Sequence, residues 1–242
     1  AYLALVYASA IFGGYIADRV LGYQHSILLG ALVMGAGLFM LMLPNQDLFI
    51  LGLSTVIVGN GLFKPNISSL VGKIYKPGDH RRDRGFSIFY MGINAGAMVS
   101  PILTDWLASS IFGTPMMTNY KVVFAAAGVG MIISYIWFYF GRKQLKGTGL
   151  LEEKPPEMSL IMKVFIGCIL AVAPTYVLMA YAGATVLAWI LFIIFAGLCY
   201  TLWKGAKEEG KVSAEKVIAM LLMFGANIMF FMFFEQAGSS FN

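Results

Sequence analysis

In the stretch Gly59-Asn60-Gly61-Leu62-Phe63-Lys64-Pro65-Asn66, a lysine stands in the middle of a long apolar run. The run extends from about residue 48 to about residue 74, which is enough for one membrane-spanning helix. A charged side chain there costs a few kcal/mol or more unless it faces a partner or a water-filled cavity. About ten residues or more separate Lys64 from either end of the run, too far for easy snorkelling to the lipid head groups. The pattern therefore favours a functional cation inside the membrane.

The neighbours of this lysine favour a helix that bends or packs closely. Pro65 removes a backbone donor next to the charge. Gly59 and Gly61 permit bending or close approach of another helix. A glycine-rich helix that carries a buried cation is more typical of a transport pathway than of a structural strut.

The composition places the whole chain in the membrane. Of the 242 residues, 59% are hydrophobic and 12% are charged, and the mean hydropathy is +0.78. Soluble domains carry about 25% charged residues, and one soluble core could not hide so much apolar surface. Charge-free runs predict about seven membrane helices and therefore an all-α membrane protein.

Basic residues give the orientation of these helices. When loops are assigned alternately to the two sides, fifteen of the seventeen Lys and Arg residues fall on one side. That side is expected to be cytoplasmic. The net charge of +5 is then a property of cytoplasmic loops rather than a sign of nucleic-acid binding. The first span is expected to end near Ala17, with Asp18 and Arg19 in a tight cytoplasmic turn before the second.

The runs divide the chain into four parts. We expect an N-terminal helical bundle over residues 1–141, a cytoplasmic linker over 142–157, a helical hairpin over 158–204 and the start of a second bundle over 205–242. Between about residues 159 and 203 the only charge is Lys163, so this hairpin is expected to face lipid outside any transport path. The chain opens without an initiator Met, directly in an apolar run, so we expect a fragment of a longer protein.

Two further polar constellations lie in apolar sequence. Glu235 ends the run Met229-Phe230-Phe231-Met232-Phe233-Phe234 and is either a proton carrier or an interfacial acid at a helix end. Tyr90 and Asn94 are four residues apart, so they share one helix face. Their glycine-rich setting fits substrate binding and helix packing equally well. Tyr7 is a weaker candidate.

Neither an enzyme nor a metal site is indicated. His25 and His80 fall in loops, and Cys168 and Cys199 are isolated within apolar runs. A channel-like protein or a membrane-embedded enzyme is the rival interpretation from another class. A channel predicts flux that does not respond to a proton gradient.

Four motifs resemble the proton-dependent oligopeptide transporters, a branch of the major facilitator superfamily. The stretch from Gly13 to Gly22 resembles the superfamily's loop between its second and third helices. Gly61-Leu62-Phe63-Lys64-Pro65-Asn66 resembles the family's fourth helix, and Phe89-Tyr90-Met91-Gly92-Ile93-Asn94-Ala95-Gly96 its fifth. Glu235-Gln236-Ala237-Gly238-Ser239-Ser240 is similar to its seventh-helix motif. The chain would then cover helices two to seven, with the helical pair that bacterial members insert between the two halves.

The resemblance implies a bacterial inner-membrane symporter for di- and tripeptides, expected to be monomeric, with protons as the coupling ion and no cofactor or metal. Lys64 and Glu235 would couple protons and contact substrate, together with Tyr7, Tyr90 and Asn94. Four residues would form the cytoplasmic gate motif: Gly14, Asp18, Arg19 and Gly22. Another small solute carried by the same family is the alternative substrate. The acid and the arginine that the family's first helix supplies as partners would precede this sequence.

Overall fold

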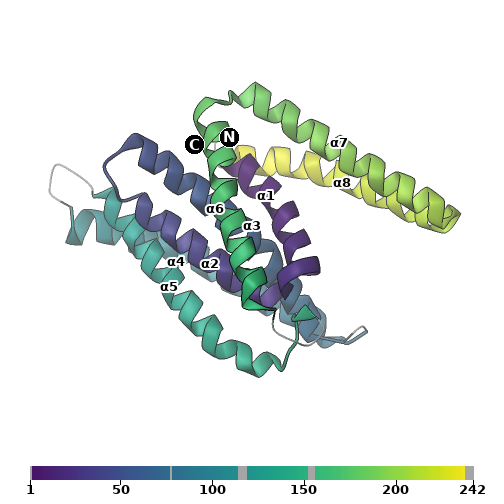
Figure 1. Ribbon diagram of the computed structural model, residues 1–242, viewed down its shortest axis with the longest axis horizontal. Coiled ribbons are helices and arrows are strands. Elements are labelled where there is room, and N and C mark those ends of the chain that lie inside the picture. The colour runs from purple at the N-terminus through teal and green to yellow at the C-terminus, as the bar shows by residue number, and fades with distance from the viewer. Residues whose placement is uncertain (1, 77, 114–118, 152–155, 238–242) are drawn as a thin grey trace. The chain divides into compact units, whose positions relative to one another are not determined.

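The computed structural model describes residues 2–76, 78–113, 119–151 and 156–237, and all regular structure there is helical (Figure 1). The chain divides into two compact units, Ala1–Gly183 and Ala184–Asn242. The first unit contains α1 (Tyr2–Ile16), α2 (Gly22–Met40), α3 (Gln46–Ile74), α4 (Arg81–Asp105), α5 (Tyr120–Gly141) and α6 (Met158–Tyr181). The second contains α7 (Ala184–Glu209) and α8 (Lys211–Ala237). Within the described ranges, seven apolar segments are long enough to cross a membrane, and one of them, Tyr2–Met40, contains both α1 and α2. The prediction of an all-α membrane protein with about seven spans is confirmed.

The joint between α1 and α2 differs from the sequence-based expectation. The prediction of a turn at Asp18 and Arg19 is wrong. These residues lie in a π-helix, η1 (Ala17–Leu21), that continues α1. The chain changes direction at Gly22, whose φ is +73°. A side chain there would be strained, and its Cβ would lie 2.8 Å from the carbonyl oxygen of Gly149. The reversal therefore falls where only glycine fits.

Helix α3 is capped at its start and runs unbroken through Pro65. The side chain of Asn45 accepts hydrogen bonds from the backbone amides of Asp47 (2.8 Å) and Leu48 (3.3 Å). Asp47 in the first turn and Lys73 in the last complement the helix dipole. This helix packs most extensively against α2 and α1 and is the centre of the first unit.

Glycines bring α3 into backbone contact with both neighbours. A Cβ added at Gly30 of α2 would lie 2.7 Å from the carbonyl oxygen of Gly59, and one at Gly37 would lie 2.8 Å from that of Gly52. On the other face of α3, a Cβ on Gly61 would lie 2.7 Å from the carbonyl oxygen of Ser9 in α1. The close approach expected at Gly59 and Gly61 is thus confirmed, with one glycine serving each neighbouring helix.

Helix α6 packs into the first unit. Cys168 is buried in one apolar cluster with Leu21, Leu29, Val33 and Leu62, against which Phe165 also packs. Part of the α6 surface thus packs on α3 and α2, while other apolar residues of the helix are exposed. The expectation that the segment from about 159 to 203 faces lipid outside the transport path stays a prediction. The division of the full transporter at residues 141, 157 and 204 stays a prediction.

Helices α7 and α8 form an antiparallel pair joined at Gly210, whose φ is +120°. Its one described ion pair, Lys211 Nζ to Glu215 at 4.0 Å, is exposed and contributes little.

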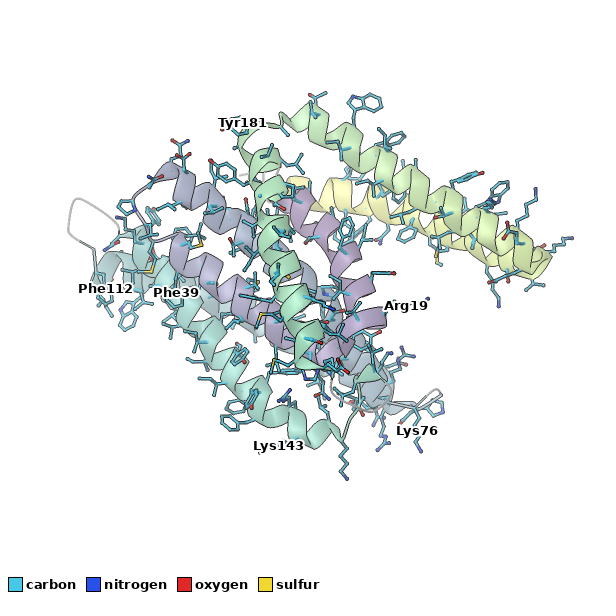
Figure 2. All side chains as sticks on the ribbon, in the orientation of Figure 1. Arg19, Phe39, Lys76, Phe112, Lys143 and Tyr181 are labelled. Carbon is cyan, nitrogen blue, oxygen red and sulfur yellow. The ribbon has the colours of Figure 1, made fainter. Side chains whose placement is uncertain are left out.

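Several basic residues of the first unit lie toward one end, where Lys73, Arg82 and Lys146 line one cavity. Figure 2 shows Lys76 and Lys143 at the end of this unit opposite Tyr181. Such segregation matches the sidedness inferred from the loop charges.

Candidate functional site

Lys64 and Tyr7 meet across the contact between α3 and α1. The Lys64 Nζ atom lies 4.9 Å from the centre of the Tyr7 ring, within the range of a cation–π interaction. Both side chains are exposed on the first unit. Among the described residues, no ion pair involves Lys64. The contact therefore supplies a partner for the ammonium group within the span and leaves its charge available to an anionic group.

A rigid joint beneath this pair holds the two helices together. The Asn66 side chain is 1% exposed, and its Nδ2 donates to the carbonyl oxygens of Gly13 (3.1 Å) and Leu62 (2.8 Å). Pro65 cannot donate to the carbonyl of Gly61 four residues earlier, and a Cβ on Gly13 would lie 1.8 Å from that carbonyl oxygen. Proline, asparagine and the two glycines thus position Lys64 against α1.

Tyr90 and Asn94 share one face of α4, as predicted from their spacing, and both are exposed. Asn94 Nδ2 donates to the Tyr90 carbonyl oxygen at 2.9 Å. None of the described residues of α4 is buried, which leaves this face available to another element or to a ligand. No described hydrogen bond or ion pair joins Tyr90 or Asn94 to Lys64.

The predicted gate motif is built around η1. Tyr23 donates its hydroxyl to Asp18 Oδ1, and its ring also packs under Lys73, whose Nζ is 4.4 Å from the ring centre. Arg19 is exposed, and a Cβ on Gly14 would meet nothing within 4 Å. Tyr23, which sequence reasoning did not single out, connects the motif to the end of α3.

Glu235 lies near the end of α8, in the second unit. Its side chain is outside the described part of the structure, as are Gly238, Ser239 and Ser240. Its role as a proton carrier stays a prediction.

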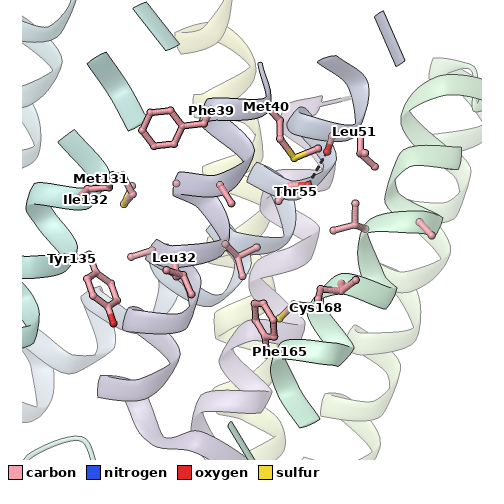
Figure 3. Close-up of a pocket in the computed structure, with 17 residues that line it drawn as sticks. Leu32, Phe39, Met40, Leu51, Thr55, Met131, Ile132, Tyr135, Phe165 and Cys168 are labelled. Atoms are coloured by element: carbon pink, nitrogen blue, oxygen red, sulfur yellow. Dashed lines mark hydrogen bonds between the residues drawn. The ribbon is translucent and has the colours of Figure 1, made fainter. Parts of the chain in front are cut away.

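An apolar cavity of about 740 Å³ lies elsewhere, between α2, α3, α5 and α6 (Figure 3). Met131 and Tyr135 of α5 line one side, and Phe165 and Cys168 of α6 line the other. Its described lining includes no charged residue, and neither Tyr90 nor Asn94 belongs to it. A peptide presents two charged ends, so this cavity is a poor site for a peptide.

Curated relatives match along the whole chain. The family model described as "POT family" matches residues 24–242. Dipeptide and tripeptide permease A of Chromobacterium violaceum is 36% identical over 248 residues, which cover 100% of this chain and 48% of the relative. The permease of the same name from Edwardsiella piscicida is 34% identical, with the same two coverages. The chain therefore spans about half the length of the curated relatives it matches.

Solved structures agree with this likeness. A bacterial homologue of the human drug peptide transporters PepT1 and PepT2 has a TM-score of 0.78 at 27% identity, covering 98% of this chain and 50% of that chain. A peptide transporter POT mutant in complex with alafosfalin has a TM-score of 0.70 at 33% identity, covering 99% and 49%. These proteins are transporters of the major facilitator superfamily fold, not enzymes. With its family match, its helical architecture and its four motifs, the chain belongs to the POT family of peptide transporters.

Proposed function

We propose that the complete protein imports di- and tripeptides together with protons across the bacterial inner membrane by alternating access. The contact of Lys64 with Tyr7 carries the proposal, because it holds a cation without a described carboxylate inside a span. The names of the relatives, dipeptide and tripeptide permease, support the substrate class. The expectation of a monomer stays a prediction, since one similar solved structure is described as tetrameric.

The chemistry of a peptide suits this arrangement. Peptides share a carboxylate, an amino group and amides, whatever their side chains. Lys64 would attract the carboxylate, with Tyr7 beside it. The exposed Tyr90 and Asn94 would offer a hydroxyl and an amide to the peptide backbone. A central cation with adaptable polar groups accepts many peptides because it contacts what they have in common.

Proton coupling would divide between Lys64 and Glu235. A carboxylate near a cation favours its ionised form, and one left in an apolar setting favours protonation. Opening and closing of the transporter would bring a cation to Glu235 and withdraw it. Alternation of this kind would make proton binding depend on the state of the transporter.

The first test uses the full-length protein in proteoliposomes with an imposed pH gradient. Lys64→Ala is expected to abolish uphill peptide accumulation, whereas Lys121→Ala, which removes an exposed lysine of α5, should leave it unchanged. Normal accumulation by Lys64→Ala would overturn the assignment of this lysine. Peptide flux in the wild type that ignores the pH gradient would favour a channel-like protein.

The second test separates coupling from translocation. Glu235→Gln imitates a permanently protonated carboxyl group, so it should lose gradient-driven uptake and keep peptide exchange, which needs no net proton movement. Counterflow and uphill uptake are measured on one preparation. If the variant still concentrates peptide, Glu235 is an interfacial acid and not the coupling site.

A different small solute is the second candidate substrate. One similar solved structure is a POT family transporter in complex with 5-aminolevulinic acid, which carries an amino group and a carboxylate without a peptide bond. Competition against labelled dipeptide uptake distinguishes the two. Inhibition by di- and tripeptides at lower concentration than by aminolevulinate supports the peptide assignment, and the reverse order supports the alternative.

A further inference from the structure

A second cavity, of about 730 Å³, opens at the basic end of the first unit. It lies between the ends of α2 and α3, the start of α4 and the linker after α5. Three cations and three hydroxyl groups are among its lining residues: Lys73, Arg82, Lys146, Ser68, Ser69 and Thr148. No acidic residue is in the described lining, in contrast to an ordinary surface with mixed charges.

The three cations of this basic cavity have no carboxylate partner within the described residues, where the ion pairs are Arg81 with Asp79 and Lys211 with Glu215. Arg81, which precedes Arg82 in sequence, differs from the three cations because it has a carboxylate partner. Its guanidinium group lies 2.8 Å from Asp79 and holds the pKa of that carboxyl group below its ordinary value. Arg82 instead lies over the Phe86 ring, 5.8 Å from its centre, and Lys73 lies over Tyr23.

The part of the cavity wall that the linker forms is held in place by hydrogen bonds to α2. The linker folds back on α2, where the Tyr23 amide donates to the Gly149 carbonyl oxygen at 2.7 Å and Gln24 Nε2 donates to that of Thr148 at 2.8 Å. Lys146 has a φ of +46°, the only positive φ of a non-glycine residue in the described chain. Such a conformation costs about 1 kcal/mol or more and persists where surrounding structure imposes it. The fold thus holds a lysine in a strained backbone conformation at the edge of the basic cavity.

We propose that this basic cavity binds a phosphate-class oxyanion, supplied by the head group of an anionic lipid or by a free phosphate. Three cations and three hydroxyl groups match the acceptor oxygens of a phosphate group. The position at the basic end of the helices places the cavity near the cytoplasmic membrane surface, where anionic lipid head groups are found. The proposal is independent of which solute the transporter carries.

Anion binding in the basic cavity would affect the gate motif through Tyr23. Tyr23 contacts Lys73 of the cavity and donates its hydroxyl to Asp18 of the motif. An anion that draws Lys73 away from the Tyr23 ring would alter the surroundings of this hydrogen bond. The cavity therefore lies one side chain from the residues assigned to the cytoplasmic gate.

The test measures binding to the full-length protein in neutral detergent and phosphate-free buffer. Short-chain phosphatidylglycerol, short-chain phosphatidylcholine and inorganic phosphate are titrated separately by calorimetry. We expect saturable binding of phosphatidylglycerol, of phosphate or of both, and binding of phosphatidylcholine at least about tenfold weaker because its choline group offsets the phosphate charge. Phosphatidylglycerol that phosphate cannot displace identifies a lipid site, and phosphate that binds alone identifies a site for a soluble anion.

Charge-removing variants locate the binding. Lys146→Asn removes the charge and keeps a residue that tolerates positive φ, and Lys73→Gln removes a second cation. Each should weaken binding about tenfold or more. Lys143→Asn on the same linker is the control, because Lys143 is exposed and lies outside the cavity lining.

Three results would overturn the proposal. One is the absence of saturable binding by either anion. Another is unchanged affinity in both Lys146→Asn and Lys73→Gln. The third concerns Glu152 and Glu153, which belong to the linker and follow Leu150 of the cavity lining closely in sequence, but lie outside the described residues. Anion binding seen only after both are changed to Gln would show that the chain neutralises its own cavity.

Discussion

Lys64 of α3 lies over the Tyr7 ring of α1, with 4.9 Å between its Nζ atom and the ring centre. Its helix also contacts α1 through Gly61 and through Asn66, whose side chain donates to Gly13. Positioning the ammonium group thus depends on the whole α1–α3 crossing and not on one residue.

The contact predicts that Tyr7→Phe and Tyr7→Leu behave differently. Phenylalanine keeps a ring beneath the ammonium, and leucine does not. A double-mutant cycle of Tyr7→Leu with Lys64→Met should show a coupling free energy of about 0.5–1 kcal/mol, the scale of an exposed cation–π pair. Unfolding of the purified full-length protein measures it. Strictly additive effects would contradict an energetic interaction between the two side chains.

The glycine contacts between α2 and α3 predict a position-specific loss of stability. Gly30→Ala and Gly37→Ala each place a methyl group less than 3 Å from a backbone oxygen, so each should destabilise the protein by about 1–3 kcal/mol. Gly35→Ala on the same helix is the matched control, because its Cβ would meet Met131 at an ordinary 3.5 Å. Thermal unfolding of the three variants should rank Gly35→Ala as the most stable. Equal melting temperatures would show that the helices separate easily.

Asn66 is expected to matter for stability more than another buried polar residue of α3. Asn66→Ala removes a hydrogen bond between helices and leaves the buried Gly13 carbonyl without this donor, at a cost of about 1–3 kcal/mol. Ser54 is also fully buried, but its hydroxyl donates to Ile50 within α3. Ser54→Ala should therefore be milder in chemical or thermal unfolding. A larger loss in Ser54→Ala would contradict the bridging role of Asn66.

Asn94→Ala should weaken peptide binding without loss of stability. One hydrogen bond to a ligand contributes about 1–2 kcal/mol, so affinity should fall about tenfold. Because Asn94 is exposed and bonds within its own helix, the melting temperature should stay constant. Ser87→Ala is the control on α4, since its hydroxyl makes a similar bond to Asp83. Unchanged affinity with lower stability would identify Asn94 as a packing residue.

Sequence was sufficient where the physics is local or cumulative. Low charge and long apolar runs were enough to predict the membrane helices, whereas the direction that the segregation of Lys and Arg indicates stays a prediction. The isolation of Lys64 in its run also marked it as unusual before any contact was known. Periodicity placed Tyr90 and Asn94 on one face because only four residues separate them.

Features that depend on distant parts of the chain were not predictable in this way. Tyr23 connects the gate motif to the rest of the unit through its contacts with Asp18, Lys73 and Gly149. Gly149 is over 120 residues away from Tyr23 in sequence. Packing of α6 against α2 and α3 depends on shape, and its apolar sequence looks the same whether it faces lipid or protein. The turn after α1 was misplaced because charges at Asp18 and Arg19 suggest a loop, while the backbone freedom needed for reversal belongs to Gly22.

The glycines that join α2 to α3 recur every seven residues on both helices, at 30 and 37 and at 59 and 52. Two turns of helix separate the contacts, so neither helix can slide by one residue without driving a side chain into the partner's backbone. The pair would consequently move as one piece during transport. Spin labels at exposed positions of α2 and α3 would therefore report one narrow distance distribution throughout the transport cycle. The motion of the other helices can then be measured relative to this fixed pair.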